Sequence, residues 1–310
     1  MSDMPDSTNL QAADRTGGED LIHALHQEGI RVIFGLPGVQ LYHAVMPLLD
    51  YPDIQFITTR HEQATTYMAD GYARASGDIG VSMIVPGPGL QNASAGITNA
   101  YAASSRVLVI CGQIERDKIG KNIGVLHEIN DQLDIVKPIT KWQSRALTSQ
   151  EIAPTIQEAF YQLRTGRPRP VEIEIPPDAL SERVSHLEYS PQYPETPPVD
   201  GAAIEEAAAL ITEAQNPVIW AGGGIHTSGA SEILLRLAEY LQIPVLTTPE
   251  GKGAISDRHH LSLGTPQGRS TGESKDELRD FFYTCDVVLA IGTRFATANP
   301  TASQTVVQID

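Results

Sequence analysis

Cysteine, cationic residues and long apolar runs are all scarce in this sequence. Its 310 residues include only two cysteines, Cys111 and Cys285, and neither lies in a CxxC pair or in a Cys/His cluster with zinc spacing. This pattern excludes a disulfide framework and a structural zinc site, and it predicts two buried free thiols. No apolar run approaches the ~20 residues that cross a bilayer, so we expect no membrane partner.

Positive charge is the second shortage. Lysine and arginine together number 22 against 38 aspartates and glutamates, which gives a formal net charge of −16. An extended grip on nucleic acid needs a high density of cations, so we expect no nucleic-acid partner. Residues 1–16 are polar and lack the cationic start and apolar centre of a signal peptide. We therefore predict a disordered leader over 1–16 and a cytoplasmic protein.

Short apolar runs alternate with longer amphipathic stretches from residue 17 onward. This alternation predicts an α/β protein in which helical crossovers cover both faces of parallel sheets. A proline-rich stretch over 186–199 cannot continue a central strand or a helix, so it predicts a semi-rigid linker. We therefore expect two doubly wound domains, 17–185 and 200–310.

The predicted elements have the following bounds. The strands are Arg31–Phe34, Ile54–Thr58, Val81–Val85, Arg106–Cys111, Val171–Ile175, Val218–Ala221, Val245–Thr248, Val287–Ile291 and Val306–Ile309. The helices are Glu19–Glu28, Glu62–Ala75, Gln91–Ala103, Glu151–Leu163, Ala202–Ala214, Glu232–Leu241 and Lys275–Thr284. Because the last predicted strand reaches the end of the chain without a closing helix, we expect that the sequence stops before the protein does.

Two segments contain candidate functional residues. Glu62 lies in the first turn of a predicted helix, where it either complements the positive helix N-terminus, worth ~0.3–1 kcal/mol, or carries acid/base chemistry. The turn Pro86-Gly87-Pro88-Gly89 follows a predicted strand and precedes a helix. Its glycines allow either a close approach of the backbone to a ligand or a tight strand-to-helix connection.

In this order the motifs resemble thiamine-diphosphate enzymes of the acetolactate synthase, pyruvate oxidase and benzoylformate decarboxylase group. The first half contributes FGLPG at 34–38, RHEQA at 60–64, ADGYAR at 69–74, GPG at 87–89 with Asn92, and CGQI at 111–114. Further matches are ITKW at 139–142, GRPRPV at 166–171, IPPD at 175–178, PVIWAGGG at 217–224, GKGAI at 251–255 and IGTRF at 291–295.

The resemblance implies a pyrimidine-binding domain over 17–185 and a Rossmann-like central domain over 200–310. It also implies decarboxylation of a 2-oxo acid with carboligation, in a dimer or tetramer of identical chains. In the family a third domain with a GDG…NN motif binds Mg²⁺ and the cofactor diphosphate, and this sequence has no such motif. Glu62 is the implied catalytic residue, because a carboxylate at pyrimidine N1′ promotes the imino tautomer. The implied thiamine-diphosphate contacts are Pro37, Gly38, Glu62, Gly87, Asn92 and Gln113.

The cofactor of the central domain stays open at this point. Flavin-bearing relatives hold FAD there, and the resemblance then assigns Arg167, Gly222, Gly223, Gly224, Thr247, Gly292 and Arg294 to FAD. However, the glycine turn is no GxGxxG fingerprint, and Arg294-Phe295 lacks the acidic residues that follow it in those relatives. The alternative is a structural domain with a vestigial nucleotide site.

Departures from the family motifs also leave the reaction open. Val39 follows FGLPG where a small residue is usual, His127 stands within the usual FQE motif, and Arg169 replaces a glycine. Alternatives within the class are a simple 2-oxo acid decarboxylase and an acyl-CoA lyase. Outside it they are a non-catalytic module that binds FAD, NAD or CoA, and an inactive fragment.

Overall fold

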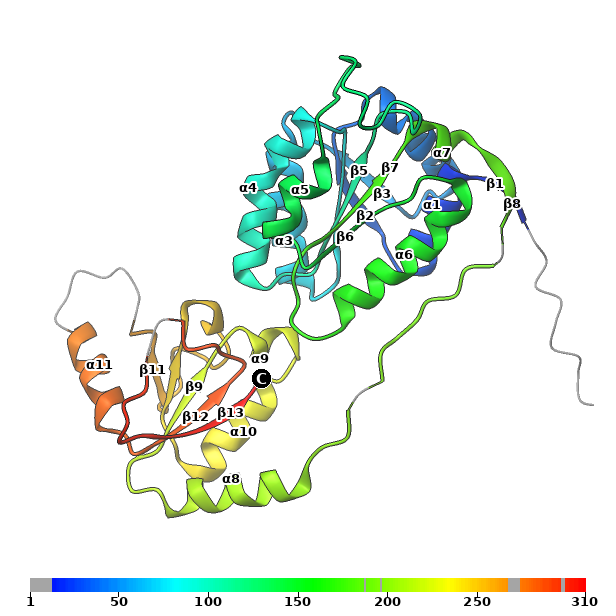
Figure 1. The fold of residues 1–310 in the computed structure, drawn as a ribbon. Coiled ribbons are helices and arrows are strands. Elements are labelled where there is room, and N and C mark those ends of the chain that lie inside the picture. Colours follow the sequence, from blue (N-terminus) through cyan, green and yellow to red (C-terminus); the bar gives the residue numbers. More distant parts are fainter. Residues whose placement is uncertain (1–12, 187, 196, 267–273, 297–298) are drawn as a thin grey trace, which may run out of the picture. The chain divides into compact units, whose positions relative to one another are not determined.

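The computed structural model describes residues 13–186, 188–195, 197–266, 274–296 and 299–310; residues 1–12 of the predicted leader lie outside it (Figure 1). The chain divides into two compact units, Met1–Glu195 and Thr196–Asp310, called below the N-terminal and C-terminal units. Within the described ranges, no helix is both long and apolar enough to cross a membrane.

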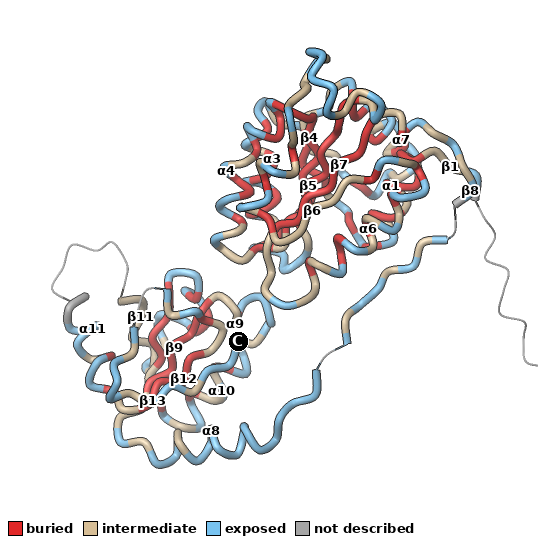
Figure 2. The backbone as a smooth tube through the Cα atoms, viewed as in Figure 1, coloured by how far each residue is buried: buried red, intermediate tan, exposed pale blue. Residues whose placement is uncertain are grey.

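The N-terminal unit contains a six-stranded parallel sheet with the strand order β3-β2-β4-β5-β7-β6. Its central strands are buried on both faces, as Figure 2 shows, because helices cover both sides. The strands are β2 (Val32–Gly35), β3 (Gln55–Thr58), β4 (Gly80–Ile84), β5 (Val107–Gly112), β6 (Trp142–Arg145) and β7 (Val171–Ile175).

Two hydrophobic clusters hold the helices to this sheet, one on each face. One face is covered by α1 (Gly17–Gln27), η1 (Val39–Leu41), α2 (Tyr42–Val45), η2 (Met46–Asp50), α6 (Ser149–Arg164) and α7 (Pro177–Ser181). The other is covered by α3 (Glu62–Ser76), α4 (Pro88–Ala103), α5 (Gln132–Val136) and η3 (Lys137–Ile139). Figure 1 shows α3 and α4 side by side, away from α1 and α6.

Part of the predicted leader is ordered, which corrects that prediction. Residues Ala13–Thr16 form strand β1, which pairs antiparallel with β8 (Arg183–His186). Thr16 then caps α1, because its side chain accepts the Glu19 N–H at 3.2 Å while the Glu19 carboxylate accepts the Thr16 N–H at 2.7 Å. Backbone pairing to a segment about 170 positions away is not visible in local sequence.

The C-terminal unit contains a five-stranded parallel sheet with the order β11-β10-β9-β12-β13. The strands are β9 (Val218–Ala221), β10 (Val245–Thr247), β11 (Ser262–Gly264), β12 (Val287–Ile291) and β13 (Thr305–Ile309). Its helices are α8 (Gly201–Glu213), α9 (Gly224–Thr227), η4 (Pro249–Gly251), α10 (Ser231–Leu241) and α11 (Ser274–Thr284). The two sheets confirm the predicted α/β class with two parallel, doubly wound sheets.

The first residues of the predicted linker lie on the N-terminal unit. The Gln157 side chain donates to the Ser190 carbonyl at 2.9 Å, and Arg164 donates to the Gln192 carbonyl at 3.1 Å. The Arg164 guanidinium also lies 4.4 Å from the Tyr193 ring centroid, within cation–π range. These contacts tie the chain as far as Tyr193 to α6.

Both cysteines are buried free thiols, as predicted. Cys111 is the fifth residue of β5, and burial raises the pKa of its thiol well above the usual value. Burial likewise raises the pKa of Cys285 to about 11. Both side chains therefore stay protonated and unreactive near neutral pH.

Candidate functional site

The candidate site lies at the topological switch point of the N-terminal sheet. Strands β2 and β4 are neighbours, yet the chain leaves β2 toward β3 on one side and leaves β4 toward β5 on the other. Ligands of open α/β sheets bind in the crevice that this divergence leaves at the carboxyl ends of the strands. Gly38 follows β2 and Gly87 follows β4, so both glycines border this crevice.

Glu62 is the first residue of α3, which begins shortly after β3 ends at Thr58, and it is only 8% exposed. Its Oε2 accepts a hydrogen bond from Asn92 Nδ2 at 3.0 Å. Among the described residues, none donates a hydrogen bond to its Oε1. A buried carboxylate with one oxygen held and the other without a donor is suited to receive a further donor from a ligand.

Glycine at position 89 lets the start of α4 lie directly beside this carboxylate. A Cβ built on Gly89 would lie 3.5 Å from Glu62 Oε1 and 2.7 Å from Val85 Cγ2. A Cβ on Gly38 would lie 2.5 Å from Cγ1 of the same Val85. Val85 therefore packs between the two glycine turns, and it brings the turn after β2 next to the start of α4.

Helices α3 and α4 pack closely, and this packing fixes Asn92 relative to Glu62. Thr66 Oγ1 donates to the Ala93 carbonyl at 2.9 Å, and a Cβ on Gly96 would lie 2.1 Å from the same hydroxyl oxygen. Only glycine allows this distance between the helices. Gly96 therefore has a structural role, because it lets α3 and α4 pack closely.

Gly87 adopts a conformation that requires glycine. Its φ is +59° and ψ is −114°, and a Cβ there would lie 2.4 Å from the His127 carbonyl oxygen. His127 itself has a φ of +70° and places Nδ1 3.3 Å from Gln40 Oε1. The loop that contains His127 therefore covers the turn after β4, and His127 lies at the border of the candidate site.

The structure gathers most, but not all, of the predicted pyrimidine contacts. Gly38, Glu62, Gly87 and Asn92 lie around the switch point, with the exposed Pro37 beside Gly38. In contrast, Gln113 uses both ends of its amide inside the protein. Its Nε2 donates to Glu174 Oε2 at 3.0 Å and its Oε1 accepts the Ile114 N–H at 2.8 Å.

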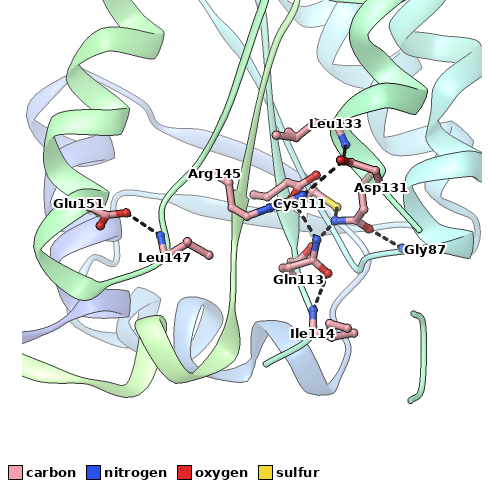
Figure 3. A network of polar contacts seen from close by, with 12 residues as sticks. Gly87, Cys111, Gln113, Ile114, Asp131, Leu133, Arg145, Leu147 and Glu151 are labelled. Carbon is pink, nitrogen blue, oxygen red and sulfur yellow. Dashed lines mark hydrogen bonds and ion pairs between the residues drawn. The ribbon is translucent and has the colours of Figure 1, made fainter. Parts of the chain in front are cut away.

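Gln113 belongs to a network of polar side chains that the sequence reading missed (Figure 3). Glu174 accepts from Arg145 Nε at 2.5 Å, and Arg145 also lies 3.4 Å from Asp131, which caps α5. The next residue, Gln132, accepts the Gly87 N–H at 2.7 Å. No local pattern indicates these contacts, because each joins segments far apart in the chain.

Glu172 is fully buried two residues before Glu174, and none of the described residues hydrogen-bonds its carboxyl group. Burial raises the pKa of Glu172 well above the usual value, and the Glu174 carboxylate raises it further. Burial also raises the pKa of Glu174, although Arg145 and Gln113 lower it. Glu172 therefore carries the proton of this pair, and Glu174 is the partner of Arg145.

In the C-terminal unit, three of the predicted FAD residues, Gly222, Gly224 and Gly292, meet at a switch point between β9 and β12. Gly222 donates to the Ile291 carbonyl at 2.8 Å and Gly224 donates to the Gly292 carbonyl at 3.0 Å. A Cβ on Gly222 would lie 2.2 Å from the Gly292 oxygen. Contact between the two turns thus accounts for these glycines without a nucleotide.

The remaining FAD candidates have separate surroundings. Thr247 ends β10 and its hydroxyl lies 2.7 Å from that of Thr265, while Gly223 faces Glu250. Arg294 follows Gly292 in this unit, whereas Arg167 belongs to the N-terminal unit, between α6 and β7. Gln267, Gly268, Thr297 and Ala298 of the flavin-like segments lie outside the described residues.

Comparison with known families identifies the class of protein. Residues 15–135 match the family "Thiamine pyrophosphate enzyme, N-terminal TPP binding domain", and residues 204–310 match "Thiamine pyrophosphate enzyme, central domain". The chain therefore belongs to the thiamine pyrophosphate (thiamine diphosphate) enzymes.

Individual relatives place it near the acetolactate synthases. It is 41% identical over 290 residues to the probable acetolactate synthase large subunit of Methanocaldococcus jannaschii and 34% identical over 288 residues to the acetolactate synthase large subunit of Lactococcus lactis. It is also 35% identical over 287 residues to the probable 2-ketoarginine decarboxylase AruI of Pseudomonas aeruginosa. These alignments cover 90–91% of this chain and 47–49% of the relatives, so the chain spans about half the length of the curated relatives it matches.

The residues at the first switch point fit the pyrimidine end of thiamine diphosphate. Among the described residues Glu62 Oε1 is an acceptor without a donor, and Gly89 lies beside it. The described residues include no cluster of three or more His, Cys, Asp or Glu side chains that could hold a metal ion. The residues around Glu62 therefore fit one end of the cofactor.

Proposed function

We propose that the natural protein containing this chain decarboxylates a 2-oxo acid with thiamine diphosphate and joins the remaining fragment to a second carbonyl compound, as an acetolactate synthase does. The observation that carries the proposal is the environment of Glu62. A buried carboxylate with one oxygen fixed by Asn92 and the other without a donor among the described residues lies at the switch point of the domain that the family uses for this cofactor.

In this proposal the Glu62 carboxylate shares a proton with the cofactor. When bound, the cofactor supplies the nucleophilic carbon and the electron sink for decarboxylation, chemistry that no side chain provides. Glu62 Oε1 holds a proton at the pyrimidine ring nitrogen N1′, and Asn92 keeps the carboxylate in the orientation required. Glu62 is the first residue of α3, so the helix fixes the position of its backbone.

We assign the cofactor diphosphate and Mg²⁺ to residues other than those described here. Two findings support this: the described residues contain no metal-binding cluster, and the relatives are about twice as long as the matched region. For FAD, the close contact between the turns after β9 and β12 favours a structural C-terminal unit over a flavin site. Visible flavin absorbance of the purified natural protein distinguishes the two.

We also propose that two copies of the chain associate. Helix α3 exposes the apolar side chains of Tyr67 and Met68, which are 43% and 38% exposed, beside the Glu62 turn. A second copy would cover these side chains and shield the candidate site from water. Light scattering of the natural protein at working concentration is expected to give at least a dimer mass.

A panel of 2-oxo acids tests the activity. The natural protein is supplied with thiamine diphosphate, Mg²⁺ and pyruvate, 2-oxobutanoate or the 2-oxo acid of arginine, the last because of the resemblance to AruI. We expect cofactor-dependent release of carbon dioxide and, with pyruvate, a carboligation product. Release without a ligation product would indicate a simple decarboxylase, and no release at full cofactor occupancy would overturn the proposal.

A further inference from the structure

Gln132 joins the two loops that follow the central strands β4 and β5. It is the first residue of α5 and is 1% exposed. Its Oε1 accepts the Gly87 N–H at 2.7 Å, while its Nε2 donates to the Gly112 carbonyl at 3.1 Å and lies 3.8 Å from Cys111 Sγ. Every polar atom of this side chain is therefore engaged at the carboxyl ends of two neighbouring strands.

The Gly87 N–H depends on this contact. Gly87 is the N-cap residue of α4, and the acceptor of its N–H is the Gln132 side chain. The amide is buried with Gln132, so without the side-chain oxygen it would lose its hydrogen bond and remain shielded from water. The contact therefore selects the backbone conformation of the turn between β4 and α4.

This turn then sets the position at which α4 begins relative to Glu62. Gly89 lies two residues after Gly87 and borders Glu62 Oε1, and Asn92 of the next helical turn donates to Glu62 Oε2. A displaced turn would carry both residues away from the carboxylate. Gln132 itself never touches Glu62, so any effect on it passes through α4.

Charged groups hold the start of α5, the helix whose first residue is Gln132. The preceding residue, Asp131, caps α5 by accepting the Leu133 N–H at 3.0 Å, and Arg145 of β6 lies 3.4 Å from the same carboxylate oxygen. Figure 3 shows Arg145 and Gly87 on opposite sides of this network, with Asp131 between them. Arg145 thus fixes the start of α5 to the edge strand β6, and the Gln132 side chain extends from there to Gly87.

We propose that Gln132 is a positioning residue, which fixes the Gly87 turn and thereby the distance between α4 and Glu62. Its effect on the chemistry rests on the function proposed above, whereas its effect on the turn does not. The two parts can be measured separately.

The first measurement is amide exchange at Gly87, with Gln132→Met as the variant. Methionine has nearly the same shape but offers neither the acceptor for Gly87 nor the donor for Gly112. Because Pro86 and Pro88 have no N–H, Gly87 supplies the only amide of that segment. We expect its exchange to be about tenfold faster in Gln132→Met, the equivalent of one lost buried hydrogen bond.

Gln143→Met is the matched control. It makes the same chemical change on β6, where Gln143 accepts only the Thr140 hydroxyl at 3.4 Å and does not contact Gly87. We expect wild-type exchange at Gly87 in this control. Gln132→Leu, which removes the same contacts with a smaller side chain, replaces the first variant if that one does not fold. Equal Gly87 exchange in wild type and variant would overturn the proposal.

The second measurement is exchange of the C2 proton of thiamine diphosphate in the natural protein at equal cofactor occupancy. We expect Gln132→Met to slow it about tenfold and Gln143→Met to leave it unchanged. A purely structural role would lower thermal stability or occupancy without slowing exchange in the loaded protein, and that result would overturn the positioning role. If wild type and Glu62→Gln exchange equally, the proposed function fails, and Gly87 exchange alone decides the role of Gln132 in the turn.

Discussion

At the level of single residues, two buried glutamates in the N-terminal unit have opposite surroundings. One oxygen of Glu62 is held by the Asn92 amide, and the other has no donor among the described residues and lies beside Gly89. Glu172 lies on β7 with no hydrogen-bond partner among the described residues and with Glu174 nearby. The first environment suits a carboxylate that exchanges a proton with a ligand, and the second favours a carboxyl group that keeps its proton.

Glu62→Gln separates a catalytic role from a structural one. The change preserves shape and still allows contact with Asn92, but it removes the group that shares a proton. We expect C2 proton exchange of bound thiamine diphosphate to fall ~10²–10⁴-fold, with ~1 kcal/mol or less lost in stability. The control is Glu232→Gln, the same change in the first turn of α10, far from this site in sequence. Equal exchange at equal occupancy would contradict the catalytic role.

Glu172→Gln is expected to stabilise the protein increasingly as pH rises. The folded-state pKa lies above the ordinary value of 4.5, so the folded state favours the protonated form. The stability that Glu172 contributes is fully present below pH 4.5 and is lost as the pH rises through the folded-state pKa. Urea unfolding at several pH values above 4.5 should therefore show that the free energy of unfolding of the variant rises relative to that of wild type as the pH increases. The exposed Glu158→Gln serves as control, and parallel profiles for wild type and Glu172→Gln would be the contrary result.

At the level of secondary-structure elements, glycines that look alike in the sequence differ in what they do. Gly71 lies within α3, with nothing within 4 Å of a built Cβ, whereas Gly87 has a positive φ and faces the His127 carbonyl. The first glycine leaves the helix less stable than alanine would. The second permits the turn that begins α4.

Gly87→Ala and Gly71→Ala should therefore shift stability in opposite directions. We expect Gly87→Ala to lose ~1–3 kcal/mol through backbone strain and Gly71→Ala to gain ~0.5–1 kcal/mol through helix propensity. The chain has two tryptophans, Trp142 and Trp220, one in each unit, so in a Trp220→Phe background the fluorescence of Trp142 reports on the N-terminal unit alone. A Gly87→Ala variant as stable as wild type would show that the turn tolerates a side chain.

At the level of the whole molecule, the described residues offer thiamine diphosphate only a partial site. Glu62 and the glycine turns fit its pyrimidine end, but no described cluster suits a metal ion. Association must first offset ~4–15 kcal/mol of lost translational and rotational freedom, and a few hydrogen bonds at one end do not supply this.

The isolated 310-residue chain is accordingly expected to bind thiamine diphosphate weakly, with or without Mg²⁺. Titration calorimetry of the chain with the cofactor, at several Mg²⁺ concentrations, measures this directly. The natural protein, titrated in the same buffer, is the reference. Micromolar or tighter binding by residues 1–310 that depends on Mg²⁺ would mean that this chain holds the diphosphate itself.

The sequence by itself determined the elements that are buried on both faces and the residues that follow them. Strands β9 and β12 have the predicted bounds, because continuous apolar character marks a strand covered on both sides. Strand β7 also has the predicted bounds, although two glutamates alternate with its apolar residues. The glycine turn after β4 was predicted because it follows such an apolar strand. Strand β6 was missed: its residues, Trp-Gln-Ser-Arg, are half-buried at the sheet edge and show no apolar run.

Only the tertiary structure decided which polar side chains meet. Gln132 reaches Gly87 across 45 positions and Gln113 reaches Glu174 across 61, and neither contact follows from the local sequence. Glu172 and Glu174 alternate with apolar residues, a pattern typical of one exposed face, yet helices bury both faces of β7. The physical reason is that hydrophobic periodicity records which local face is buried, whereas hydrogen-bond partners depend on the order in which distant strands are placed side by side.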